Sequence, residues 1–181
     1  NAGSGTFTLN DGVIASNSSV HAGGGVANVG TFTMTGGTVI SNKTHNGGGV
    51  WSLATTTIKG GAISNNVADG SDGHGGGIFV DTGTTSIEGG TITSNRALTD
   101  GGGVWSGDTL NFTGGTVKAN TATAEGGGLW IKGGSTLNMQ GHPAVYKNKA
   151  SLGKGLLLAY TDNPDNTRIN ITGKIEKIAR V

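Results

Sequence analysis

Residues 87–105 read IEGGTITSNRALTDGGGVW, and the two glycine signals in this stretch recur through most of the chain. Self-similarity at a fixed period of tens of residues is typical of repeat architectures. The chain therefore consists of about six copies of a unit of roughly 25 residues. The Gly-Gly-Gly triplet occurs at 23–25, 47–49, 75–77, 101–103 and 126–128, and a degenerate copy occurs at 153–155.

A second signal lies between the triplets. An apolar residue is followed by any residue, Gly-Gly, Thr or Ala, an aliphatic residue, two further residues and Asn. Clear copies are MTGGTVISN from Met34, IKGGAISNN from Ile58, IEGGTITSN from Ile87 and FTGGTVKAN from Phe112. Weaker copies start at Leu9 and Met139, and ITGKI from Ile171 begins a seventh.

Aligning the copies produces three apolar columns, each within a short run of alternating apolar and polar residues. Alternation with period 2 predicts strands, and these runs are too short for helices. The first column is Val26, Val50, Ile78, Val104, Leu129 and Leu156; the second is Leu9, Met34, Ile58, Ile87, Phe112, Met139 and Ile171; the third is Ile14 or Val13, then Val39, Ile63, Ile92, Val117 and Val145.

Three short strands per repeat, with like residues recurring in each repeat, predict an all-β, right-handed, single-stranded parallel β-helix of six to seven coils. Stacking is required because one coil cannot bury its apolar columns alone. We expect one domain over residues 1–181, with regular coils over 6–148 and irregular terminal coils over 149–181. The chain starts at Asn1 in mid-pattern, so we interpret it as a piece of a longer protein.

Composition restricts the function classes. The chain has 37 Gly, 2 Pro and no Cys, which excludes collagen, a disulfide scaffold and a Cys-based metal site. Its net charge of +1 without a basic block argues against nucleic acid as a partner. It has no apolar run long enough to cross a membrane. We expect no cofactor, with calcium as the cation that the acidic residues discussed below could hold.

One Asn recurs at the same place in every copy. Asn tolerates the left-handed backbone conformation and hydrogen-bonds in turns. We expect these residues to stack at one corner and to bond to each other along the axis as a structural ladder. They are Asn17, Asn42, Asn66, Asn95, Asn120 and Asn148.

The units GGTVISN, GGAISNN and GGTITSN, followed by GGGVW or GGGIF, resemble bacterial cell-surface repeats. They look like the repeats of polymorphic outer-membrane proteins, which are autotransporter passengers, and of adhesins with a pectin-lyase-like β-helix. The resemblance covers residues 6 to about 148, although the copies lack the Phe of the FxxN unit. It implies a secreted or surface-exposed stalk or adhesin that contacts a host or environmental glycan or protein, and it leaves the oligomeric state open.

An aromatic residue follows the first apolar column in four copies: Trp51, Phe79, Trp105 and Trp130. If the first column faces the core, alternation points these rings outward. We expect an exposed aromatic ladder that could bind carbohydrate. The alternative is a ladder whose rings stack on each other and only stabilise the coil.

Polar residues precede the glycine triplets, among them His74, Asp100 and Glu125 on three successive copies. Two carboxylates about 5 Å apart would suit a retaining glycosidase, and they could equally hold a hard cation. A solvated polar turn is the simpler interpretation. Asp100, Glu125 and His74 are therefore the only catalytic candidates.

Thr-x-Thr pairs precede the second apolar column and resemble the ice-binding faces of some β-solenoid antifreeze proteins. Charged or polar residues at the next outward position (Lys59, Glu88 and Gln140) oppose this interpretation, and Thr is also simply a good strand former. The alternative ice face comprises Thr6, Thr8, Thr31, Thr33, Thr55, Thr57, Thr84, Ser86, Thr109 and Thr136, with Asn111 and Asn138 continuing the pattern.

Together these patterns favour a noncatalytic extracellular adhesin or stalk module with a carbohydrate-binding aromatic face. Ice binding and a polysaccharide-active enzyme are the two alternatives.

Overall fold

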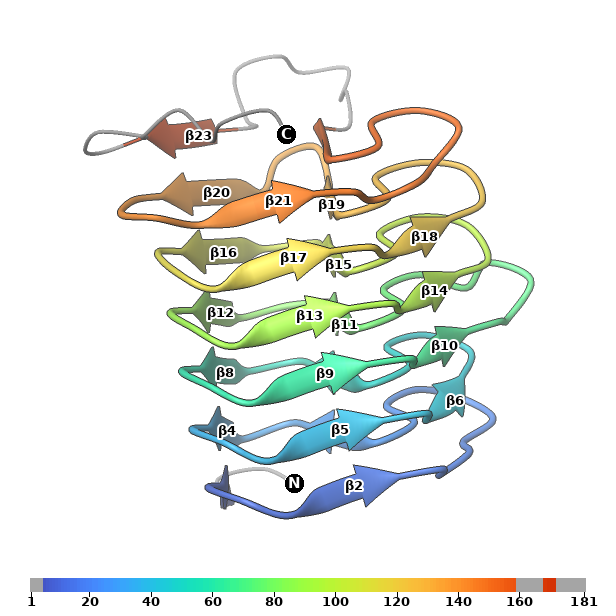
Figure 1. The fold of residues 1–181 in the computed structure, drawn as a ribbon, viewed down its shortest axis with the longest axis vertical. Coiled ribbons are helices and arrows are strands. Elements are labelled where there is room, and N and C mark those ends of the chain that lie inside the picture. The colour runs from blue at the N-terminus through green and yellow to red at the C-terminus, as the bar shows by residue number, and fades with distance from the viewer. Residues whose placement is uncertain (1–4, 159–167, 172–181) are drawn as a thin grey trace.

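The computed structural model describes residues 5–158 and 168–171, and it confirms the predicted right-handed parallel β-helix. Near strands run left to right and far strands right to left while the chain rises, so the coil is right-handed (Figure 1). No helix occurs within the described ranges. Of the predicted terminal coils, residues 159–167 and 172–181 lie outside the described residues.

The first sheet carries the Thr-x-Thr pairs and is called the Thr sheet. Its strands pair in parallel and in register, so that Thr6 lies beside Thr31 and Leu9 beside Met34. It consists of β1 (Thr6–Leu9), β4 (Thr31–Met34), β8 (Thr55–Ile58), β12 (Thr84–Ile87), β16 (Thr109–Phe112), β20 (Thr136–Met139) and β23 (Arg168–Ile171).

The second sheet follows each strand of the Thr sheet after a tight glycine corner. Its middle residues form the third apolar column and point inward, while the residues on either side point outward. It consists of β2 (Val13–Ala15), β5 (Thr38–Ile40), β9 (Ala62–Ser64), β13 (Thr91–Thr93), β17 (Thr116–Lys118) and β21 (Ala144–Tyr146).

The aromatic sheet closes each coil. Its strands begin with the first apolar column and carry the aromatic residues at their middle position. It consists of β3 (Val26–Asn28), β7 (Val50–Ser52), β11 (Ile78–Val80), β15 (Val104–Ser106), β19 (Leu129–Ile131) and β22 (Leu156–Leu158).

A fourth, short sheet was not predicted. Its two-residue strands lie between the Asn column and the glycine triplets: β6 (Lys43–Thr44), β10 (Val67–Ala68), β14 (Arg96–Ala97) and β18 (Thr121–Ala122). The second residue of each strand is small and buried. Two residues are too few to show alternation, so the three-strand prediction missed this side of the coil.

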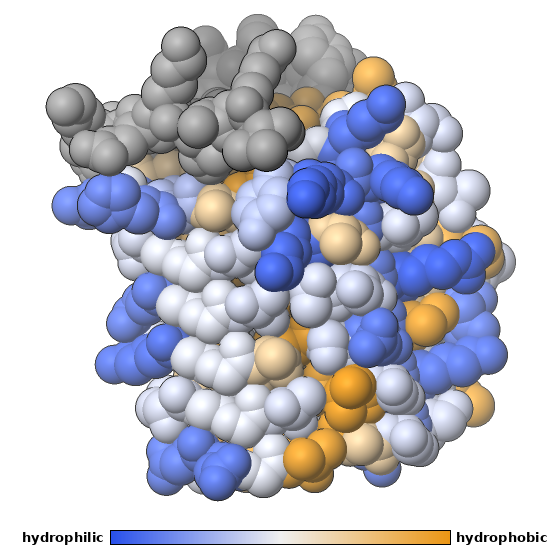
Figure 2. Space-filling model, viewed as in Figure 1, coloured by the Kyte–Doolittle hydropathy of each residue, from blue (hydrophilic) through white to orange (hydrophobic). Residues whose placement is uncertain are grey.

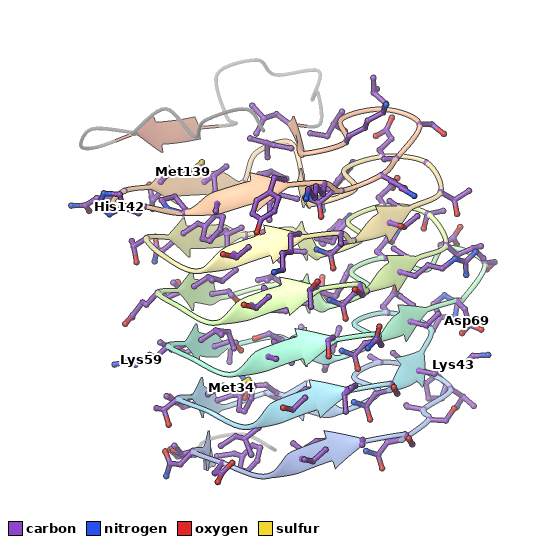
Figure 3. The ribbon with its side chains drawn as sticks, in the orientation of Figure 1. Met34, Lys43, Lys59, Asp69, Met139 and His142 are labelled. Carbon is purple, nitrogen blue, oxygen red and sulfur yellow. The ribbon has the colours of Figure 1, made fainter. Side chains whose placement is uncertain are left out.

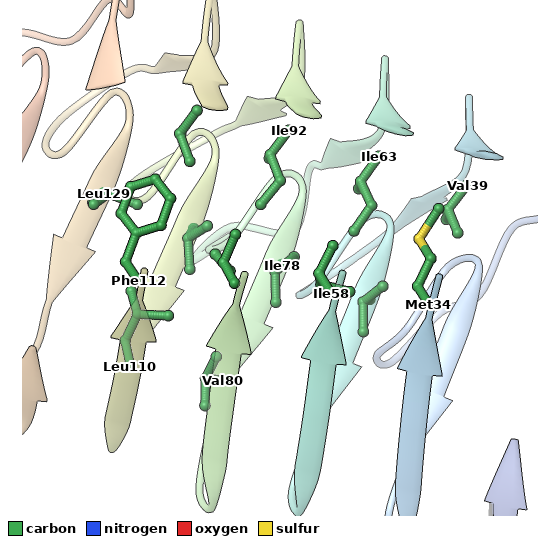
Figure 4. Close-up of a cluster of buried hydrophobic side chains, with 14 of the residues drawn as sticks. Met34, Val39, Ile58, Ile63, Ile78, Val80, Ile92, Leu110, Phe112 and Leu129 are labelled. Carbon is green, nitrogen blue, oxygen red and sulfur yellow. The ribbon is translucent and has the colours of Figure 1, made fainter. Parts of the chain in front are cut away.

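The interior holds the three predicted apolar columns. Met34, Ile63 and Ile78, one from each column, are almost completely buried and point into the same space (Figure 4). Burial of each such side chain stabilises the fold by about 1.5–3 kcal/mol. Residues of the terminal coils, such as Ile14 and Leu156, are only partly buried. The core is therefore continuous along the axis and is most completely covered in the middle coils.

The Asn ladder is confirmed, with one correction. The side-chain nitrogen of Asn66 donates to Oδ1 of Asn95 at 3.0 Å and to the backbone oxygen of Val39 at 3.0 Å. The left-handed conformation belongs to the residue before each Asn, such as Asn65 with φ 54°, and not to the ladder residue itself. The backbone N–H of Asn66 also donates to Oδ1 of Asn95, so both the backbone and the side chain of a ladder residue bond to adjacent coils.

The glycine triplets form the corner where successive coils come closest. Gly75 has a φ of 64°, which favours glycine. A Cβ on Gly76 would lie 2.6 Å from the backbone oxygen of Gly102 in the next coil. The middle glycine is therefore required by close contact between backbones, and the first by its conformation.

Candidate functional site

The predicted aromatic residues form one column on the outer face of the aromatic sheet. Phe79 lies in register between Trp51 and Trp105, and Trp105 lies beside Trp130. The parallel register aligns these rings because every coil contributes the same strand position. We call Trp51, Phe79, Trp105 and Trp130 the aromatic column.

The rings in the middle of the aromatic column stack on each other. Ring centroids are 4.4 Å apart for Phe79 and Trp105 and 5.1 Å apart for Trp105 and Trp130. Such pairs contribute about 1 kcal/mol beyond the burial of their area. The stacking leaves Phe79 7% and Trp105 8% exposed. The expectation of an exposed ladder is therefore wrong for these two rings, because each covers the face of the next.

The two ends of the aromatic column differ from its middle. Trp51 and Trp130 remain partly exposed. The register partner of Trp51 towards the N-terminal end is Ala27, whose side chain is a single methyl group. The partner of Trp130 on the other side is the larger Leu157. The structure thus reduces four candidate stacking rings to two, and Trp51 has the smaller neighbour.

The polar residues before the glycine triplets are also in register, although the connections before them differ in length. The backbone nitrogen of Gly75 donates to the backbone oxygen of Asp100, and that of Gly101 donates to the backbone oxygen of Glu125. His74, Asp100 and Glu125 therefore lie on three successive coils at one corner. We call these three residues with Asn46 the corner column.

Hydrogen bonds connect the corner column to the stack. Oδ1 of Asp100 accepts the backbone N–H of Glu125 at 3.1 Å, and its Oδ2 lies 3.4 Å from Nδ1 of His74. Oε2 of Glu125 accepts the indole N–H of Trp130 at 3.1 Å. Asn46 likewise accepts the backbone N–H of His74. Both carboxylates thus hold neighbouring parts of the fold in place.

Burial shifts the protonation of two groups at this corner. It lowers the pKa of His74, although the nearby carboxylates of Asp100 and Asp72 oppose the shift. It raises the pKa of Asp100, which Glu125 raises further and His74 lowers. The neutral imidazole of His74 also lies against Trp105, with ring centroids 5.6 Å apart. At neutral pH the contact between His74 and Asp100 therefore joins a neutral imidazole to a carboxylate.

The sequence did not reveal an unpaired donor within the aromatic column. Nε1 of Trp105 is buried and has no hydrogen-bond partner among the described residues. The benzene edge of Trp105 lies beside Gly107. In the next coil, the indole N–H of Trp130 donates to Glu125, whereas the residue of the corner column equivalent to Glu125 one coil earlier is Asp100, which is one methylene shorter.

The Thr sheet presents two outward rows. The second row is continuous from Thr8 through Ser86 to Asn138, because each residue pairs in register with the next. From β1 to β20 the first row is Thr6, Thr31, Thr55, Thr84, Thr109 and Thr136; the second is Thr8, Thr33, Thr57, Ser86, Asn111 and Asn138; all of these are exposed or partly exposed. In β23, Arg168 pairs in register with Thr136 and Asn170 with Asn138.

The described residues lack two features, a cluster of metal ligands and a membrane-spanning helix. They contain no group of three or more His, Cys, Asp or Glu side chains placed to hold a metal ion. Within the same ranges, no helix is long and apolar enough to span a membrane.

Comparison with known proteins adds no family to this geometry. No family model matches the chain, and no curated protein or solved structure matches it. The site and the repeats themselves are therefore what can indicate a function.

Proposed function

We propose that this chain is a noncatalytic stalk or adhesin module on the outside of a bacterial cell, and that Trp51 binds carbohydrate. The observation that carries the binding proposal is the partly exposed indole of Trp51 beside the methyl group of Ala27. An indole face with a small neighbour leaves room for the apolar face of a sugar ring. The partner is a glycan on a host or environmental surface.

The repeats support the surface location. Units such as GGTVISN followed by GGGVW resemble those of bacterial surface β-helices. A stack of coils with a continuous core suits a rigid spacer, because each coil contacts only its neighbours and length grows with coil number. The stalk role thus follows from the architecture together with the resemblance.

The hydrogen bonds of the corner column favour a noncatalytic role. Asp100 and Glu125 lie on adjacent coils, as a glycosidase pair would require, but each already accepts a bond from the fold. A retaining enzyme needs one carboxylate free to attack and the other free to donate a proton.

A glycan array comparing the parent chain with Trp51→Ala tests the binding role. We expect the parent to bind a subset of glycans and the variant to lose that binding with little change in thermal stability. The matched control is Tyr146→Ala, since Tyr146 is an exposed aromatic residue (37%) on the second sheet. Unchanged binding by Trp51→Ala, or no binding by the parent, would rule out the Trp51 site.

The surface location has its own test. Antibodies raised against the chain should label intact cells of the source organism without permeabilisation. Labelling only after permeabilisation would contradict the extracellular assignment, whatever the glycan result.

A further inference from the structure

The outward rows of the Thr sheet are more regular than strand propensity requires. From β1 to β20 all six first-row positions are Thr, with Arg168 of β23 next in register, and the second row contains only Thr, Ser and Asn. Thr favours strands in general, so propensity alone should produce similar rows on the second sheet. There the outward residues are mixed: Val13, Thr38, Ala62, Thr91, Thr116 and Ala144 in one row, and Ala15, Ile40, Ser64, Thr93, Lys118 and Tyr146 in the other.

The surface view agrees with this contrast. Figure 2 shows the second sheet facing the viewer, with hydrophobic patches over the lower coils among pale polar residues. Val13 is 67% exposed on this face and Tyr146 37%. Of these two sheets, only the Thr sheet carries regular outward rows of polar residues. Both sheets are parallel, so the parallel architecture does not explain the rows.

The geometry of the rows defines a two-dimensional grid. Register places equivalent hydroxyls about 4.8 Å apart from coil to coil, and alternate residues of a strand are about 6.6 Å apart. Each Thr hydroxyl donates one hydrogen bond and accepts up to two. It can therefore take over part of the hydrogen bonding of a water molecule. A matching ligand must repeat in two directions and must itself consist of donors and acceptors.

We propose that the Thr sheet binds ice. Ordered water repeats in two dimensions, whereas a single glycan chain repeats in one. The Thr methyl groups beside the hydroxyls restrict the orientations of neighbouring water, which favours an ordered layer. The grid also has no aromatic ring at its outward positions in the described residues, so sugar stacking is not its chemistry.

Charged side chains lie at the margin of this grid. Lys59, which the sequence suggested would disturb ordered water, follows β8 and projects from the corner between the Thr sheet and the second sheet (Figure 3). Its ammonium group lies 3.9 Å from the carboxylate of Glu88 on the next coil. The two rows themselves carry no charged residue from Thr6 to Asn138.

Thermal hysteresis and partition into growing ice test the proposal, with matched variants on the two sheets. Thr57→Lys places a charge in the middle of the second row, between Thr33 and Ser86. Thr93→Lys places the same charge at an outward position of the second sheet. We expect the parent and Thr93→Lys to show hysteresis and ice partition, and Thr57→Lys to lose both. Circular dichroism confirms that each variant is folded.

Three results would overturn the proposal. One is the absence of hysteresis and ice partition for the parent chain at its highest soluble concentration. Another is an equal loss in Thr57→Lys and Thr93→Lys. The third is binding to insoluble chitin or cellulose that Thr57→Lys abolishes, without hysteresis, because the grid would then recognise a polysaccharide surface. Trp51→Ala should keep full hysteresis, which separates this proposal from the carbohydrate site.

Discussion

Nδ2 of Asn95 lies 3.0 Å from Oδ1 of Asn120 in the next coil, and the backbone N–H of Asn95 donates to the same oxygen at 2.9 Å. The carboxamide oxygen of Asn120 thus accepts two bonds from one neighbouring coil, while the carboxamide nitrogen of Asn95 donates to both adjacent coils. All of these groups are buried, so water cannot replace a missing partner.

Asn95→Ala should therefore be strongly destabilising. It removes the acceptor for the backbone N–H and the side-chain nitrogen of Asn66, and it leaves Oδ1 of Asn120 with only one of its two donors, the backbone N–H at position 95. Because unsatisfied buried polar groups cost about 1–3 kcal/mol each, we expect a total loss of about 3 kcal/mol or more. Urea denaturation measures it. Asn17→Ala is the control, since Asn17 is exposed at the end of the ladder and should cost about 1 kcal/mol or less.

Gly76→Ala should prevent correct stacking of the coils. Its Cβ would lie 2.6 Å from the backbone oxygen of Gly102, and neither backbone can move without separating two coils. Gly134→Ala is the matched comparison, because a Cβ there meets nothing within 4 Å and φ is 88°. We expect Gly134→Ala to cost about 1–2 kcal/mol from its conformation alone. Similar melting temperatures for the two variants would contradict the close-contact interpretation.

Trp105→Ala should lower stability far more than Trp51→Ala. Trp105 stacks on both Phe79 and Trp130 and is buried, so its truncation should cost about 3–5 kcal/mol. Trp51 is partly exposed and should cost clearly less. Thermal unfolding followed by circular dichroism compares them. Equal losses would mean that Trp51 is as structural as Trp105, and would weaken the proposed glycan site.

Glu125 separates a structural role from a catalytic one. Glu125→Gln keeps an oxygen that can accept the indole N–H of Trp130, so stability should change by less than about 1 kcal/mol. Glu125→Ala leaves that donor unpaired and should cost about 1–3 kcal/mol. A glycosidase assay on the parent and on Glu125→Gln completes the test. Turnover by the parent that Glu125→Gln abolishes would favour the enzyme alternative.

The buried imidazole of His74 should make stability depend on pH. Its pKa lies below the ordinary 6.5 when folded, so the unfolded chain takes up this proton first on acidification. Stability should fall as pH decreases through 6.5, and the raised pKa of Asp100 should oppose the fall at lower pH, towards 3.8. Melting temperatures across this range should depend less on pH in His74→Asn. A His74→Asn variant that keeps the pH dependence of the parent would contradict this assignment.

Much of the fold was predictable because its chemistry repeats. Three apolar columns with period 2 identified three sheets, and one recurring Asn identified the ladder. The short sheet escaped prediction because a strand such as Val67–Ala68 is too brief to alternate. The small buried residue two positions after each ladder Asn, such as Ala68 or Ala97, was the signal that could have indicated it.

The site was less predictable than the fold. Alternation correctly pointed Phe79 and Trp105 away from the core, but it could not show that rings on adjacent coils bury each other. The register of His74 with Asp100 depended on loops of unequal length, which the sequence does not align. Such features arise from contact between coils, and a single repeat carries no information on the spacing of its neighbours.

The backbone bonds of the parallel ladders run between one coil and the next, roughly along the axis of the rod. When a stack of this kind is pulled at its ends, every coil carries the same tension, but the end of the chain concentrates the load on the few bonds of the outermost coil. Under tension we therefore expect the coils to peel one at a time from that end and to give a sawtooth of force against extension. The stack would then dissipate mechanical shock while the remaining coils stay folded.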